Sequence, residues 1–540
     1  MSAHPRRSLA LLLAMACMPL AVLAAAAPAN NDAAKTGAFE HYWATPRSVT
    51  TRGEVTVGGQ HIRYSADAAT LILRNKDGKP TGEMFYVAYF KSGGDASGRP
   101  IAFLYNGGPG GSSAPLHMGA FGPVRVVTES HTHTPPAPYQ LVSNQYSLLD
   151  ACDLVFVDAM GTGFSRILGK DDGGVGTPKD FYGVDPDAKA FAQFISRFLS
   201  KYGRWNSPKY LIGESYGTTR SAAVANLLEQ DDSIDLNGIV LLSTILNFDT
   251  SVDSANLNPG VNLPYALALP TYAATAWYHK VLPQPPPALH PWLDEVQTWA
   301  MGPYLQALNA GSTLPQAQLQ SIAAQMARYT GLPESYILKA GLRVTGPQFE
   351  HQLLLSRDES TGRLDARFSG PTLDPLAEYV EYDPEIAAIG SAYTSALNEY
   401  MRGTLHFGDE HHYEFLSLDI NSQWKMLHTP PGQSTPAYTA PNVLPDLAAA
   451  MTVNPDLKVL VNAGYFDLAT PYYAAVYQMQ QLPMAAKLQK NIEYRFYDTG
   501  HMIYVVPQAL AQLHDNIAQF IRASSGGPAG AAARGAAASR

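Results

Sequence analysis

Short apolar runs without polar alternation recur along this chain. They cover residues 101–105, 154–157, 210–212, 239–242 and 459–461. Such runs are typical of strands that are buried on both faces of a parallel sheet. Stretches with helical spacing of apolar residues lie between some of them, at residues 188–202 and 218–229. This strand–helix alternation predicts a mostly parallel, doubly wound α/β sheet.

The first hundred residues follow a different pattern. Polar and apolar positions alternate through residues 53–91, and Glu54–Val57 and Met84–Phe90 read as strands. The stretch Asn75-Lys76-Asp77-Gly78 between them has turn composition. We therefore expect the sheet to begin with antiparallel strands.

Residues 250–445 interrupt the rhythm of strands and helices. They contain a proline-rich stretch at 283–287, a helical pattern at 315–329 and a Pro/Ser/Thr-rich stretch at 429–445. We interpret this region as a large, mainly helical cap inserted into the sheet domain, where caps shape the substrate cleft. The expected order is a signal peptide at 1–27, core at 28–249, inserted cap at 250–445, core at 446–523 and a disordered tail at 524–540.

The N-terminus has the pattern of a secretory signal. Arg6 and Arg7 precede an apolar run, and four alanines at 24–27 offer a cleavage site. The run is too short for a typical membrane anchor. We expect export to the periplasm or the outside medium, without stable membrane association. Cleavage would remove Cys17 and leave Cys152 as a single, structural thiol.

The composition indicates a folded protein and gives no support for a nucleic-acid-binding function. The chain has 540 residues, 46% hydrophobic and 15% charged, with a net charge of -9. A folded core is therefore expected, and the negative charge gives no reason to propose nucleic-acid binding.

The most informative motif is Gly213-x-Ser215-x-Gly217, between an apolar run and a helical pattern. This is the pattern of a nucleophile elbow, which exposes the serine hydroxyl on a strained turn at the end of a strand. The backbone N–H of the next residue, Tyr216, can then help to stabilise an oxyanion.

A serine nucleophile needs a base and a carboxylate that orients it, in the chain order Ser, acid, His for this architecture. Asp467 follows the strand-like run that ends in Asn462-Ala463-Gly464. His501 follows a second such run, at residues 494–497. Both lie past the carboxyl end of a strand, where open α/β sheets build their sites.

A glycine-rich loop, Asn106-Gly107-Gly108-Pro109-Gly110-Gly111-Ser112-Ser113, follows the run that ends at Tyr105. Such a loop lets backbone N–H groups approach a ligand closely. It is similar to the oxyanion loops of esterases, and it lacks the lysine of a phosphate-binding P-loop.

The sequence resembles the serine carboxypeptidases, the family of carboxypeptidase Y and its plant and bacterial relatives. The resemblance rests on four blocks: residues 106–113, residues 158–165, residues 213–217, and residues 464–467 together with 500–502. It implies an α/β-hydrolase fold and removal of C-terminal residues from peptides or proteins through an acyl-enzyme, without a cofactor. By the same match Ser215, Asp467 and His501 form the triad, and Gly108 and Tyr216 supply the oxyanion hole. Asn106, Gly107 and Glu214 would bind the substrate's C-terminal carboxylate.

Glu214 is an unusual neighbour for a substrate carboxylate, because two bare carboxylates repel each other. A protonated Glu214 can instead donate a hydrogen bond, which favours activity at mildly acidic pH. Members of the family commonly pair this glutamate with a second one, and Ala120 stands at the matching position here. The family also usually has Cys where this chain has Gly111, and Trp where it has Leu104. We expect a broader or less acidic pH profile than the family norm.

Two alternatives stay open. The first is ester hydrolysis or acyl transfer, which would use the same triad with a different acceptor. The second is a non-enzymatic binding protein on the same fold; such a protein would be expected to have lost a triad residue, and none is lost here. The histidines at 131, 133, 411 and 412 lack a convincing set of partners, so no metal site is expected.

Overall fold

The computed structural model describes residues 46–437 and 439–526. The predicted signal peptide and residues 527–540 of the predicted tail lie outside this range. Ser524, the first residue of that predicted tail, is the last residue of the long C-terminal helix. In the described part of the chain, no helix combines the length and the apolar character needed to cross a bilayer.

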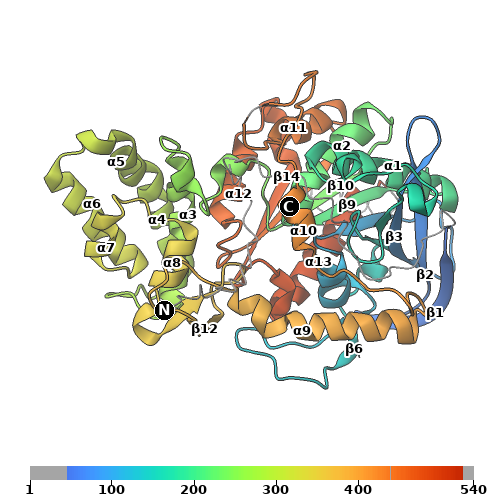
Figure 1. Ribbon diagram of the computed structural model, residues 1–540, viewed down its shortest axis with the longest axis horizontal. Coiled ribbons are helices and arrows are strands. Elements are labelled where there is room, and N and C mark those ends of the chain that lie inside the picture. Colours follow the sequence, from blue (N-terminus) through green and yellow to red (C-terminus); the bar gives the residue numbers. More distant parts are fainter. Residues whose placement is uncertain (1–45, 438, 527–540) are drawn as a thin grey trace, which may run out of the picture.

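A mixed sheet runs through the larger part of the protein (Figure 1). Its order is β1-β2-β3-β7-β4-β9-β10-β13-β14, and the short β8 pairs with β3. All neighbours from β7 to β14 are parallel, whereas β1, β2 and β3 are antiparallel to each other and β3 is antiparallel to β7. The strands of this sheet are β1 (Ser48–Val57), β2 (Gln60–Arg74), β3 (Pro80–Lys91), β4 (Ile101–Tyr105), β7 (Asp153–Val157), β8 (Arg166–Ile167), β9 (Lys209–Glu214), β10 (Gly238–Leu242), β13 (Lys458–Gly464) and β14 (Ile492–Tyr497).

Helices cover both faces of the sheet. One apolar cluster joins the sheet to α1, α2, α11 and α12. The other joins its opposite face to α9, α13 and the π-helical turn Leu116–Phe121. The α-helices are α1 (Val184–Tyr202), α2 (Tyr216–Gln230), α3 (Leu263–Tyr278), α4 (Leu289–Trp299), α5 (Leu305–Ala310), α6 (Gln316–Thr330), α7 (Glu334–Lys339), α8 (Gly346–Gln352), α9 (Pro384–Glu399), α10 (Leu418–Gln423), α11 (Leu444–Val453), α12 (Tyr472–Gln480) and α13 (Pro507–Ser524). Short two-stranded ribbons pair β5 (Val124–Val126) with β6 (Leu141–Ser143) and β11 (Glu359–Thr361) with β12 (Ser369–Pro371).

The predicted fold class is confirmed. Each of the five unalternated runs is a strand of the parallel part, and the predicted antiparallel start is formed by β1, β2 and β3. The helical patterns at 188–202, 218–229 and 315–329 lie in α1, α2 and α6. The turn at Asn75 is closed by a bond of 3.0 Å from its N–H to Lys79 O.

The region between β10 and β13 has two parts that pack differently. Helices α3 to α8, residues 263–352, form a separate bundle that we call the lobe, to one side of the sheet in Figure 1. The lobe has its own apolar cluster, which reaches the sheet domain at Phe466, Leu468 and Tyr472. Residues 353–443, which we call the return segment, run back along the sheet domain and contribute α9 to its core. Helix α11 then begins at Leu444.

Candidate active site

Ser215 stands at the turn between β9 and α2. Its backbone has φ 61° and ψ -130°, a positive φ that costs energy for any residue with a side chain. The turn is held by a bond from Ser215 N–H to Leu242 O at 3.0 Å and one from Thr218 N–H to Ser215 O at 2.8 Å. A Cβ on Gly213 would lie 2.2 Å from Gly217 O, so the elbow can close only with glycine there. The predicted nucleophile elbow is therefore present.

Asp467 and His501 follow the carboxyl ends of β13 and β14 and meet across that edge of the sheet. His501 Nδ1 lies 2.8 Å from Asp467 Oδ2, and both side chains are buried. Burial alone would lower the pKa of His501, but the Asp467 carboxylate outweighs burial and raises it above its ordinary value. A bond from the Ser243 hydroxyl to His501 O at 2.7 Å fixes the backbone of the histidine.

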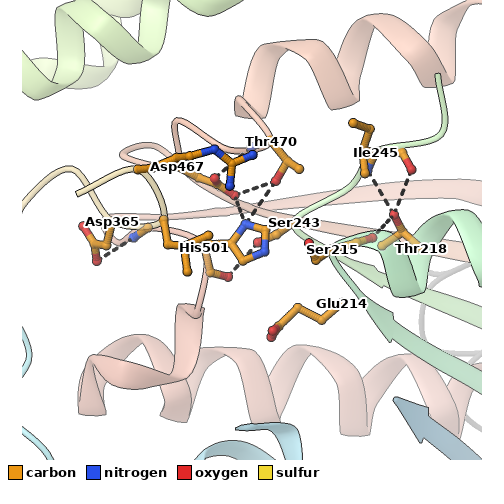
Figure 2. Close-up of polar contacts among 12 residues, drawn as sticks. Glu214, Ser215, Thr218, Ser243, Ile245, Asp365, Asp467, Thr470 and His501 are labelled. Atoms are coloured by element: carbon orange, nitrogen blue, oxygen red, sulfur yellow. Dashed lines mark hydrogen bonds and ion pairs between the residues drawn. The ribbon is translucent and has the colours of Figure 1, made fainter. Parts of the chain in front are cut away.

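In the view of Figure 2, the His501 imidazole lies between Asp467 and Ser215. The Nδ1 side of the ring contacts Asp467, which leaves Nε2 on the side of the ring toward Ser215. Among the described contacts, no hydrogen bond joins Ser215 Oγ to the ring; such bonds are often long in a free enzyme and shorten when substrate binds. The structure thus brings together the three residues that the sequence placed in a triad.

The glycine-rich loop lies against the start of α2. A Cβ on Gly107 would be 2.4 Å from Tyr216 N, so glycine permits this contact between the loop and the elbow. Gly108 has φ +114°, a conformation that side chains disfavour. The loop is anchored by Asp158, whose Oδ1 accepts the N–H and hydroxyl of Ser113 at 2.8 and 2.7 Å. Gly107 therefore brings the glycine-rich loop, in which Gly108 is the next residue, against the backbone of Tyr216 at the elbow.

Glu214 is buried directly beside Ser215. Its Oε1 accepts a hydrogen bond from Asn106 Nδ2 at 2.6 Å and one from Tyr504 Oη at 3.2 Å. Its Oε2 is buried and has no hydrogen-bond partner among the described residues. Burial raises the pKa of Glu214 to about 7, although His501, Tyr504 and Asn106 oppose the shift. The Asn106 amide is oriented in turn by Leu116 N–H, which donates to its Oδ1 at 3.1 Å.

Three groups at this site were not predicted from the sequence. Thr470 donates its hydroxyl to Asp467 Oδ2 at 2.6 Å and its N–H to Oδ1 at 2.9 Å. Tyr504 contacts Glu214. Residues 363–367 of the return segment bond to the loops that carry Asp467 and His501. Thr470 and Tyr504 each follow a predicted triad residue by three positions, a local signal that could have identified them; residues 363–367 have no such signal.

His117, close to the glycine-rich loop in sequence, does not face the site. It stacks on Phe156, and its Nε2 lies 2.6 Å from Tyr89 Oη. Burial lowers its pKa to about 3. A neutral core histidine of this kind has a structural role.

A mostly parallel sheet with an elbow serine and covering helices defines an α/β-hydrolase. The structure is similar to the crystal structure of Kex1(delta)p, a prohormone-processing carboxypeptidase from Saccharomyces cerevisiae. The TM-score is 0.51 at 15% identity, and the match covers 84% of this chain and 92% of that one. At this identity the likeness shows the fold.

Residues 74–282 match the family model for serine carboxypeptidases. This segment contains the glycine-rich loop, residues 158–165 and the elbow, and through it the chain resembles that family. Asp467 and His501 lie beyond the matched segment. The structure, by contrast, brings them to the elbow.

Curated relatives match about a third of this chain. The pheromone-processing carboxypeptidase kex1 of Schizosaccharomyces japonicus is 28% identical over 169 residues, 31% of this chain and 29% of that protein. The serine carboxypeptidase-like 36 protein of Arabidopsis thaliana is 26% identical over 184 residues, 32% of this chain and 34% of that protein. The matches thus span about a third of each relative's length.

Proposed function

We propose that this protein is an exported serine-type carboxypeptidase that releases C-terminal residues from peptides through an acyl-enzyme. Support comes from the match of residues 74–282 to the serine carboxypeptidase family and from the grouping of Ser215, Asp467 and His501. Export rests on the N-terminal pattern of residues 1–27, which lie outside the described structure.

In the proposed reaction, Ser215 Oγ attacks the carbonyl carbon of the last peptide bond while His501 Nε2 accepts the hydroxyl proton. Asp467 holds the ring in the tautomer that has a free Nε2 and stabilises the imidazolium that forms. The N–H groups of Gly108 and Tyr216 donate to the tetrahedral oxyanion. The imidazolium then protonates the leaving amine, and a water molecule activated by His501 hydrolyses the acyl ester.

The observation that carries the carboxypeptidase proposal is the state of Glu214. A carboxyl with a pKa of about 7 is largely protonated below neutral pH and can donate a hydrogen bond. Its Oε1 already accepts two bonds, so a proton on the unpartnered Oε2 is available for the substrate's carboxylate. Asn106 would supply a second donor, and Gly107 a backbone wall for the same group.

The test is digestion of a blocked dipeptide and its C-terminal amide by the purified protein and by Ser215→Ala. We expect release of the last residue from the free acid alone, and at least a 10³-fold loss in Ser215→Ala. Equal cleavage of acid and amide, or cleavage of simple esters alone, would favour an esterase or acyltransferase that uses the same triad. It would also remove Asn106 and Glu214 from the carboxylate site.

The same assay run against pH examines Glu214 directly. The raised pKa means that Glu214 is protonated below about pH 7, so turnover of the free acid should decline as pH rises through that value. In Glu214→Gln an uncharged amide replaces the carboxyl, and this decline should disappear. A sharp maximum near pH 4–5 that is unchanged in Glu214→Gln would contradict this role.

A further inference from the structure

Residues 363–367, with the sequence Arg-Leu-Asp-Ala-Arg, pass between the loop that carries Asp467 and the loop that carries His501. We call these five residues the strap. They belong to the return segment, more than 90 residues before either loop. The strap bonds to the loop before and after Asp467 through Ala366 N–H to Phe466 O at 2.9 Å, Leu468 N–H to Arg363 O at 3.1 Å and Ala469 N–H to Arg363 O at 3.1 Å.

The strap also bonds to the histidine loop. His501 donates its own N–H to Leu364 O at 2.8 Å, and Gly500 donates its N–H to Asp365 Oδ2 at 3.0 Å. Both amides at the turn that presents the imidazole are therefore satisfied by the strap. In Figure 2, Asp365 lies on the side of His501 that faces away from Ser215.

Asp365 is rigidly held. It is fully buried and receives a forked ion pair from Arg367, whose Nε lies 2.9 Å from Asp365 Oδ1. Arg367 also donates to the Thr499 hydroxyl at 3.1 Å. A Cβ on Gly500 would lie 2.4 to 2.5 Å from three Asp365 atoms, including its Cα. The glycine before the catalytic histidine is thus required by the strap that packs against it.

The strap is itself anchored from two directions. Asp383, at the start of α9, accepts the N–H groups of Arg363 and Leu364 at 3.0 Å each. On the side of the lobe, the Arg363 guanidinium binds Asp253 at 2.6 Å. A misplaced strap would therefore require movement of α9 or of the segment that leads into the lobe.

We propose that the strap, and Asp365 in particular, positions the triad. It keeps the Asp467 and His501 loops at the separation at which Nδ1 meets the carboxylate and Nε2 faces Ser215. Asp365 is a positioning residue that acts through the Gly500 N–H and touches no reacting atom. The inference rests on the proposed role of Ser215, Asp467 and His501, but not on the nature of the substrate.

The test compares Asp365→Ala and Asp365→Asn with the wild-type chain. Asp150→Ala serves as the control, because Asp150 is a mostly buried carboxylate paired with Arg522 and His514 just before the start of β7, at the far end of the strands from Ser215. Two rates are measured: turnover of the blocked dipeptide, and phosphonylation of Ser215 by a small alkyl fluorophosphonate, which transfers its phosphonyl group to the serine oxygen and releases fluoride. The second rate reports on the triad without any peptide-binding subsite.

We expect Asp365→Ala to lower kcat and the phosphonylation rate about 100-fold, because a displaced imidazole no longer aligns with the hydroxyl, and to leave KM nearly unchanged. Asp365→Asn keeps an acceptor for the Gly500 N–H and should be reduced only about 10-fold. Asp150→Ala should lose stability but keep both rates. If Asp365→Ala does not fold, Asp365→Asn compared with Asp150→Asn carries the test.

Wild-type phosphonylation and turnover rates in the folded Asp365 variants would overturn the proposal. So would equal losses in Asp365→Ala and Asp150→Ala, since those would reflect general destabilisation. Wild-type protein that is phosphonylated but does not cleave the dipeptide would refute the carboxypeptidase proposal and leave the strap's role standing. A wild-type Ser215 that does not react would refute both.

Discussion

The two parts of the inserted region, the lobe and the return segment, are joined in sequence yet relate to the site in opposite ways. The lobe packs mainly on itself and meets the sheet domain around Phe466, Leu468 and Tyr472. The described residues of the return segment form no apolar cluster of their own; Leu353, Leu354 and Ala366 belong to the cluster of the lobe. Helix α9 of the return segment contributes Ile389, Tyr393 and Leu397 to the cluster under the sheet.

The return segment also holds both sides of the site by backbone bonds. Ser417 N–H donates to Gly110 O at 2.9 Å, and Ser112 N–H to Phe415 O at 3.0 Å, so it fixes the glycine-rich loop. The strap fixes the loops of Asp467 and His501. An insertion that looks like one cap in the sequence is therefore a lobe that borders the site and a segment that is built into it.

Among substitutions that compare the lobe with the return segment, the largest effect is expected from one that forces the return segment away from the site. In Gly500→Ala the new Cβ would overlap Asp365, so either the strap or the loop that carries His501 must move. We expect about a 100-fold fall in kcat, measured with the blocked dipeptide on protein shown to be folded by circular dichroism.

The matched control is Gly390→Ala in α9. There the nearest atom to a new Cβ is 3.7 Å away, and alanine is a better helix former than glycine by about 1 kcal/mol. It should keep wild-type kcat. Similar losses in both variants would mean that this region responds to any substitution, and the contrast between contact with the site and remote packing would be lost.

A second comparison makes the same substitution, a buried leucine to alanine, once in the lobe and once in the return segment. Leu293 of the lobe and Leu397 of α9 are both buried, and Leu→Ala at such positions costs about 2–5 kcal/mol of stability. We expect Leu293→Ala to loosen the lobe and leave Ser215 phosphonylation unchanged, because the lobe has its own core. Leu397→Ala should slow phosphonylation as well, because α9 packs in the cluster that includes Met118 and Tyr504.

Urea unfolding and phosphonylation, measured on the same samples, decide this second comparison. Equal rates in the two leucine variants would show that the lobe and the return segment are equally remote from the chemistry. A slower rate in Leu293→Ala would make the lobe the part that supports the triad.

The sequence allowed prediction where the physics is local. The central strands are unbroken apolar runs, and the elbow needs small residues at Gly213 and Gly217 because the chain packs against itself there. Strand β2 was missed: its alanines at 66, 68 and 69 weaken the apolar pattern although they are buried. The strap could not be found, because its bonds join backbone groups far apart in sequence. Neither the periodicity nor any motif in the sequence indicates which carbonyl will accept the N–H of His501.

The smallest expected effect concerns His428, which ties the end of the return segment to the sheet domain. Its Nδ1 lies 2.7 Å from Asp185 of α1 and its Nε2 2.8 Å from Asp446 of α11. Burial alone would lower the pKa of His428, but hydrogen bonds to both carboxylates raise it to about 9. A histidine in the unfolded chain titrates near pH 6.5. The folded state therefore holds an extra proton between about pH 6.5 and 9, so the contribution of His428 to stability is complete below that window and is lost as pH rises through it.

His428→Gln should accordingly destabilise the protein more at pH 6 than at pH 9.5. We expect a difference of about 1–2 kcal/mol between the two values, less than the full pKa shift implies, because Asp185 is partly exposed and the pair is screened. Urea unfolding at both pH values measures it, and phosphonylation of Ser215 at pH 6 should stay at the wild-type rate. A loss of stability that does not change with pH would mean that His428 is neutral in the fold and that packing, rather than charge, holds this end of the return segment. A slower phosphonylation would show instead that the loss of the His428 contacts changes the geometry of the triad. The return segment would then act on the site as one rigid unit rather than through the strap alone.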